Sequence, residues 1–183
     1  MVVKTHQADE PKRRLAAASW VEQRELRAPR RAELAKAVEP LVTDREDGVF
    51  GPGVRALQKL GTADNIPAFE AFLRSGIPYD RRGIYHFLGK TKDARAAALL
   101  VRELDARDGG AAREALKACG PAAEGVVCKL LQSDRREERL AAVNVLQTIG
   151  TKASVPSLEK AKNDKDRMVQ EGAKKALRLI ADR

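Results

Sequence analysis

The stretch LLQSDRREERLAAVNVLQTIG at residues 130–150, followed by TKASVPSLEKA at residues 151–161, decides the fold of this 183-residue chain. Leu146 and Ile149 stand three residues apart, on one face of a helix, and Gly150 follows directly. Glycine after an amphipathic run is the usual residue beyond a helix end, because it accepts a left-handed backbone. Val155-Pro156 then suits the first turn of a new helix, where proline loses no hydrogen bond. The stretch therefore predicts a helix, a short turn and a second helix.

The same pattern recurs along the chain at intervals of about thirty residues, which is the signature of a repeat protein. The recurring glycines are Gly61, Gly89, Gly120 and Gly150. Two apolar columns precede these marks, one and four residues before them: Leu60, Leu88, Cys119, Ile149 and Ile180, and Leu57, Tyr85, Leu116, Leu146 and Leu177. After the marks, a further helix is expected to begin at Ile66, Ala94, Gly125 and Val155.

These columns predict an all-α fold, a right-handed α–α superhelix of about five HEAT-like helix pairs with an N-terminal capping helix. Each pair has a helix A, a turn and a helix B that ends at the mark. The expected organisation is a tail and capping helix at residues 1–28 and a repeat array at 29–183, with units at about 30–61, 62–89, 90–120, 121–150 and 151–183. The capping helix should run from Asp9-Glu10-Pro11 to about Arg27 and pack Leu15, Trp20 or Leu26 against the first unit.

The segment at residues 130–161 resembles the short HEAT-like repeats named after the phycobilisome lyases. The matching positions are Asp134, Arg139, Ala141, Ala142, Gly150, Val155 and Pro156, and GTADNIPAFEAFLRS at 61–75 matches again. The likeness covers roughly residues 31–183 and weakens at 76–112 and around Gly125, where the proline is displaced to Pro121. The resemblance implies a helical solenoid and, for most members of that repeat family, an interaction scaffold; a minority attach bilins or act on nucleic acids.

Composition narrows the possible classes. No apolar run approaches the roughly 18 residues of a membrane span, and the polar stretch Met1–Arg14 lacks the apolar core of a signal peptide. Cys119 and Cys128 fit no common zinc spacing, so we expect two small core residues, no metal and a cytoplasmic protein. The net charge of +9 is spread along the chain and is compatible with an acidic partner, including nucleic acid.

A partner is expected on the concave surface, where the solvent-facing positions of the B helices form a ladder. The predicted binding surface consists of nine polar or charged residues: Arg55, Gln58, His86, Glu114, Lys117, Asn144, Gln147, Lys175 and Arg178. A basic ladder of this kind can also follow phosphates, but the aromatic stacking platforms of single-strand binders are missing from it. The competing interpretation is an ordinary solvated face of amphipathic helices.

Evidence for catalysis is weaker. Gly51-Pro52-Gly53-Val54-Arg55-Ala56 fits a GxGxxA dinucleotide pattern, but no strand precedes it, so we interpret it as a loose turn that opens a B helix at about Val54. His6 falls in the expected N-terminal tail, and His86 has no nucleophile or carboxylate in register with it.

The predicted function is a non-catalytic protein–protein interaction scaffold, free-standing or within a larger protein, with no catalytic residue and no cofactor. The alternative is binding of nucleic acid or another polyanion through a basic concave face. An enzyme such as a bilin lyase or a HEAT-like DNA glycosylase is the minor alternative.

Overall fold

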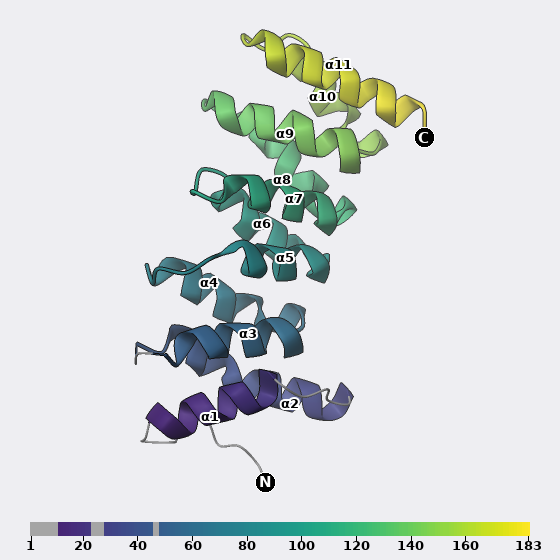
Figure 1. Cartoon of the computed structure of the whole chain (residues 1–183). Helices are drawn as coiled ribbons and strands as arrows, with labels where there is room; N and C mark the ends of the chain where they lie inside the picture. The colour runs from purple at the N-terminus through teal and green to yellow at the C-terminus, as the bar shows by residue number, and fades with distance from the viewer. Residues whose placement is uncertain (1–10, 23–27, 46–47) are drawn as a thin grey trace. The chain divides into compact units, whose positions relative to one another are not determined.

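The computed structural model describes residues 11–22, 28–45 and 48–183 and divides the chain into two compact units, Met1–Ile84 and Tyr85–Arg183. Within these residues every regular element is a helix and no strand occurs (Figure 1). The predicted all-α fold of the α–α superhelix class is therefore confirmed. Among the described residues, no helix is both long enough and apolar enough to cross a membrane.

The first unit is organised around α3, which packs against α1, α2 and the short 3₁₀ helix η1. Its helices are α1 (Pro11–Glu22), α2 (Ala28–Val38), η1 (Glu39–Thr43), α3 (Phe50–Leu60), η2 (Ala63–Asn65) and α4 (Ile66–Arg74). Leu41, Leu57 and Phe69 are almost fully buried and form part of its core. α5 (Arg82–Thr91) begins in this unit and ends in the second.

The second unit continues the alternation of helices through α6 (Ala94–Arg102), α7 (Gly109–Cys119), α8 (Pro121–Leu130), α9 (Arg136–Ile149), η3 (Lys152–Ser154), α10 (Val155–Ala161) and α11 (Arg167–Ala181). The B helices α7, α9 and α11 follow one another on one side of this unit, with α9 in contact with both neighbours (Figure 1). The A helix α8 packs against α6 and α9, and α10 packs against α11. Stacking thus buries apolar stripes that no single helix could bury alone.

The core agrees with the predicted columns. The residues directly before the marks are all buried, and of those three residues earlier only Leu177, in the last helix, stays partly exposed. Tyr85 is fully buried, and its hydroxyl donates a hydrogen bond to Glu103 Oε2 at 2.7 Å. Periodicity alone therefore located the packing face of each B helix.

The role predicted for the glycines is wrong at most marks. Only Gly120 has a positive φ, of 64°; Gly61 and Gly150 have negative φ values, and Gly89 lies inside α5, whose left-handed residue is Lys92. Close packing explains two of these positions. A Cβ on Gly89 would lie 2.7 Å from the carbonyl oxygen of Ala115, and one on Gly150 would lie 2.5 Å from that of Leu146.

Two predicted helix starts also need correction. α8 begins at Pro121 instead of Gly125, because the left-handed Gly120 lets proline take the first position. α3 begins at Phe50, and Gly53 is buried in its first turn, where an added Cβ would lie 2.7 Å from that of Leu41. The Gly-Pro-Gly segment is therefore a close helix contact and not a loose turn.

The N-terminal helix α1 packs against α3 through small residues. Ala17, Ala18 and Val21 are buried, whereas Trp20, one of the three predicted contacts, is 38% exposed. The side chains of the other two, Leu15 and Leu26, lie outside the described residues, as does His6. Short side chains let the two helices approach closely.

Candidate functional site

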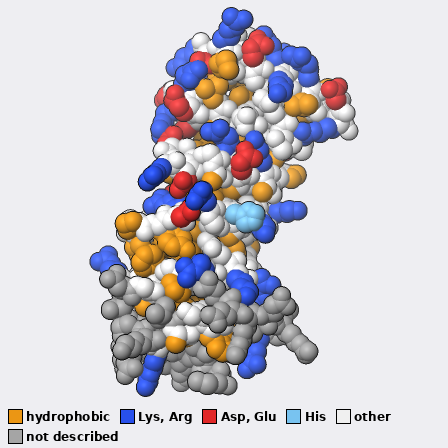
Figure 2. All heavy atoms as spheres, viewed as in Figure 1, with side chains coloured by type: hydrophobic (Ala, Val, Ile, Leu, Met, Phe, Trp, Pro, Cys, Tyr) orange, Lys and Arg blue, Asp and Glu red, His pale blue; other side chains and the backbone are white. Residues whose placement is uncertain are grey.

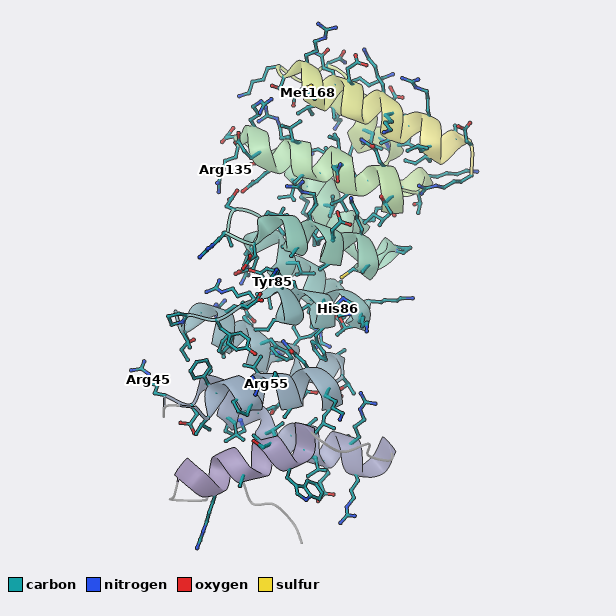
Figure 3. The ribbon with its side chains drawn as sticks, in the orientation of Figure 1. Arg45, Arg55, Tyr85, His86, Arg135 and Met168 are labelled. Carbon is teal, nitrogen blue, oxygen red and sulfur yellow. The ribbon has the colours of Figure 1, made fainter. Side chains whose placement is uncertain are left out.

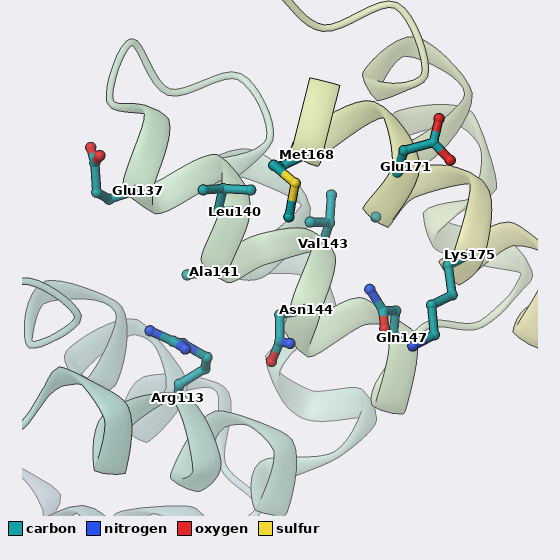
Figure 4. Close-up of a pocket in the computed structure, with 11 residues that line it drawn as sticks. Arg113, Glu137, Leu140, Ala141, Val143, Asn144, Gln147, Met168, Glu171 and Lys175 are labelled. Carbon is teal, nitrogen blue, oxygen red and sulfur yellow. The ribbon is translucent and has the colours of Figure 1, made fainter. Parts of the chain in front are cut away.

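The candidate site is an open groove of about 480 Å³ across three B helices of the second unit, which we call the B-helix groove (Figure 4). It is lined by Arg113 of α7, by Glu137, Leu140, Ala141, Val143, Asn144 and Gln147 of α9, and by Met168, Glu171, Gly172 and Lys175 of α11.

A close approach of α9 and α11 shapes the floor of the groove. A Cβ on Gly172 would lie 2.5 Å from Cγ2 of Val143, so only glycine allows the two helices to meet at this level. Leu140, Val143 and Met168 lie together at one end, and Met168 is 63% exposed (Figure 4). The groove therefore offers an apolar surface to a ligand at this end.

The other end of the groove is polar. Asn144 and Gln147 follow one another along α9, and Lys175 lies beside them on α11 (Figure 4). Each amide side chain carries both a donor and an acceptor, which is what a peptide backbone requires of a partner. The wall opposite is formed by Arg113, whose Nε is buried without a hydrogen-bond partner in the described part of the chain.

The groove carries charges of both signs. Two cations, Arg113 and Lys175, and two carboxylates, Glu137 and Glu171, line it. Lysine, arginine, aspartate and glutamate side chains are likewise mixed over the visible face of this unit (Figure 2). The Lys174 ammonium, 2.9 Å from Glu171, holds the pKa of that carboxyl below its usual value. The polyanion alternative predicts a face on which basic residues dominate, and the groove lining has equal numbers of cations and carboxylates.

The predicted ladder is only partly gathered in the groove. Asn144, Gln147 and Lys175 line it, whereas Glu114 and Arg178 lie on its helices but outside its lining. Lys117 forms an ion pair of 2.9 Å with Glu114 and lines a second hollow of about 450 Å³ at the helix turns. The use of the ladder for binding remains a prediction.

The other three ladder residues lie towards the N-terminus. Arg55 and Gln58 belong to the first unit, and His86 is exposed on α5 (Figure 3). Gln58 Nε2 is buried without a hydrogen-bond partner in the described structure, next to Gly83, where an added Cβ would lie 2.9 Å away. Gln58 is thus partly a packing residue.

Sequence reasoning missed the half of the groove nearest the starts of the B helices. Glu137, Leu140, Met168 and Glu171 continue the ladder at helical spacing, one and two turns before Asn144 and Lys175. Extending the two columns in that direction would have found them. Arg113 gave no such signal, because its position is adjacent to the ladder and corresponds to Val143 in the next repeat.

The histidine, cysteine, aspartate and glutamate side chains elsewhere in the described structure form neither a metal site nor an activated nucleophile. No group of three or more histidine, cysteine, aspartate or glutamate residues in it could hold a metal ion. Both cysteines are free thiols; burial raises the pKa of Cys119 to about 11 and also raises that of Cys128. A raised pKa is the opposite of what a thiolate nucleophile needs.

Comparisons with known proteins bear on the fold of the chain and not on its function. No model of a known protein family matches the sequence, and no curated protein matches it. Two engineered proteins solved by the Northeast Structural Genomics Consortium are similar in structure. One has 18% identity and a TM-score of 0.50 and is covered over 95% of its length by 98% of this chain. The other has 20% identity and a TM-score of 0.51, with 99% of this chain covering 57% of it.

A designed armadillo repeat protein also aligns, with 16% identity, a TM-score of 0.49 and coverage of 97% of this chain and 98% of its own. At such low identities the two engineered proteins bear on the fold alone. The subtype suggested by the resemblance to phycobilisome-lyase repeats stays a prediction.

Proposed function

We propose that this chain is a non-catalytic interaction module that holds a protein partner in the B-helix groove of its second unit. The observation that carries the proposal is the groove itself, which combines an exposed apolar end at Met168 and Leu140 with amides and charges further along. Protein-binding surfaces typically combine apolar contacts with neighbouring polar groups. Repeat proteins present such surfaces by stacking helices.

The mixed charge supports a protein partner over a continuous polyanion. Glu137 and Glu171 line the groove, so a phosphate backbone laid along it would pass two carboxylates as well as two cations. Proteins that bind single strands add aromatic stacking platforms, and the groove lining contains no aromatic residue among the residues described. Raised thiol pKa values and an exposed His86 outside the groove support the non-catalytic part of the proposal.

Selection of random peptides displayed on phage against the immobilised chain tests this proposal. Met168→Glu places a charge at the apolar end, and its exposure lets the helix accommodate it. Ala181→Glu, on the exposed end of the same helix, is the matched control. We expect selected peptides to lose about tenfold or more in affinity for the Met168 variant, as a central apolar contact would, and to keep it for the control.

Three results would count against the proposal. These are no enriched peptide, equal affinity of the enriched peptides for the parent chain and the Met168 variant, or displacement of the peptides by oligonucleotides at physiological salt. Unchanged thermal melting of both variants establishes that any loss of affinity is local.

A further inference from the structure

The carboxylates and the cations that line the B-helix groove differ in one respect: the carboxylates have ion-pair partners in the protein. Glu171 forms an ion pair of 2.9 Å with Lys174, and Glu137 lies 3.9 Å from Arg136. Both partners are outside the groove lining. Each carboxylate of the groove therefore already has a cation of the protein beside it, closely for Glu171 and, for Glu137, through an arginine shared with Asp166.

The two cations of the groove have no such compensation. Within the described residues, neither Arg113 nor Lys175 has an ion-pair or hydrogen-bond partner. Arg113 Nε is shielded from solvent, so the guanidinium has exchanged part of its hydration for no acceptor in the protein. A bound carboxylate would pair with the guanidinium nitrogens other than the shielded Nε, and arginine binds carboxylates through its planar fork of donors.

The positions of the other groove residues indicate which further groups of the ligand would be bound beside its carboxylates. Asn144 and Gln147 lie between the two cations, where their amides can meet a peptide backbone, and Met168 with Leu140 supplies the apolar contact (Figure 4). We propose that the B-helix groove binds an acidic peptide segment. One aspartate or glutamate of the peptide pairs with Arg113, another pairs with Lys175, and an apolar side chain packs on Met168 and Leu140. This inference rests on the proposed function and names the chemistry of its partner.

A peptide fits these observations better than a nucleic acid. A phosphate backbone brings a charge with every nucleotide, whereas the groove has two uncompensated cations beside two carboxylates and an exposed methionine. Alternating acidic and apolar side chains match that arrangement. The net charge of +9 would assist the encounter with an acidic partner.

Fluorescence anisotropy with defined peptides tests the inference. The probe is a labelled peptide that alternates aspartate and leucine; one counterpart has lysine at every aspartate, and another has serine at every leucine. We expect the acidic, leucine-containing peptide to bind about tenfold tighter than either counterpart at physiological salt. An oligonucleotide of matched charge serves as competitor.

Variants assign the preference to the groove. Arg113→Met and Lys175→Gln should each weaken binding of the acidic peptide, by about tenfold and about threefold, because each removes one charged contact. Lys160→Gln, an equally exposed lysine on α10 without an ion-pair partner in the described structure, should leave binding unchanged.

Several outcomes would overturn the inference. They are tighter binding of the lysine peptide, equal losses in the Lys175 and Lys160 variants, displacement of the acidic peptide by the oligonucleotide, or no binding of any defined peptide. If phage-selected peptides still depend on Met168 but carry basic residues, the inference fails and the proposed interaction function stands. If no peptide depends on Met168, both fail.

Discussion

The arginines at the start of α9 and the cations of the B-helix groove belong to the same unit and carry the same charge, but they are used differently. Arg135, Arg136 and Arg139 are ion-paired to Asp105, Asp166 and Asp164, aspartates in the loops of neighbouring helix pairs. Arg135 projects from the edge of the unit (Figure 3).

Arg113 and Lys175, in contrast, have no such partner within the described residues. The comparison separates the cations of this unit that join repeats from the two groove cations, which have no partner among the described residues. Only the second kind indicates a binding surface. The predictions below test whether that division holds.

The largest effect is expected at Arg139, the most buried of the paired arginines. Its Nε donates to Asp164 Oδ2 at 2.8 Å, its Nη2 to Oδ1 at 3.2 Å, and its Nη1 to the carbonyl oxygens of Ser133 and Asp134. Arg139→Met would remove the arginine donors of two carbonyls and of the buried Asp164 carboxylate, which would keep only the backbone amide of Asp166. We expect the free energy of unfolding to fall by about 3–5 kcal/mol, measured by urea denaturation followed by circular dichroism.

The control for this prediction removes both charges. Arg139→Met combined with Asp164→Leu should recover part of the lost stability, because replacing a whole buried pair by apolar residues costs less than breaking it. If the single variant loses less than about 1 kcal/mol, the value typical of an exposed pair, then Arg139 does not join the repeats.

A smaller effect, visible only in acid, is expected at Asp166. The Arg136 guanidinium, whose Nε lies 2.6 Å from Oδ2, holds the pKa of this carboxyl below its usual value, and the backbone amides of Met168 and Val169 act in the same direction. The pKa is therefore lower in the folded state than in the unfolded state. The stabilisation is complete above the unfolded value of about 4 and is lost as the pH falls through the folded value.

Asp166→Asn keeps an acceptor at the helix cap but removes the titrating charge. We expect the melting temperature of the parent chain to fall more steeply below pH of about 4 than that of the Asp166 variant. Asp182→Asn, at an exposed aspartate without an ion-pair partner in the described structure, is the matched control and should retain the parent's steepness. Equal pH profiles for the parent and the Asp166 variant would show that the pair with Arg136 is not coupled to folding.

The sequence predicted the buried face of each B helix because burial repeats with the helical period. Leu57, Leu88, Leu116 and Leu146 are all fully buried as expected. It did not predict which glycines adopt a left-handed backbone conformation and which allow another part of the chain to pack closely. The requirement at Gly89 comes from the carbonyl of Ala115 in another helix, and no local pattern reports such a contact.

The candidate site shows the same limit. Asn144, Gln147 and Lys175 were predictable as solvent-facing positions of helices, and they line the groove. Arg113 was not, because its position faces the core in the next repeat, and its missing acceptor is a property of three-dimensional packing. A pattern of residues can indicate exposure, but whether a charge has a partner depends on residues far away in the sequence.

The smallest effect on stability is expected at Arg113, and it separates the two kinds of cation most sharply. Arg113→Met removes a half-buried guanidinium that has no partner among the described residues and replaces the shielded Nε by a methylene group. Because no hydrogen bond or ion pair is lost, we expect the free energy of unfolding to stay within about 1 kcal/mol of the parent, with any change towards higher stability. The measurement is the urea denaturation used for Arg139, and the peptide titration supplies the opposite readout, since binding should fall. A loss of about 2 kcal/mol or more would place Arg113 with the arginines that join repeats. An arginine without a partner in the free chain makes no ion pair or hydrogen bond there, so its removal should cost little stability.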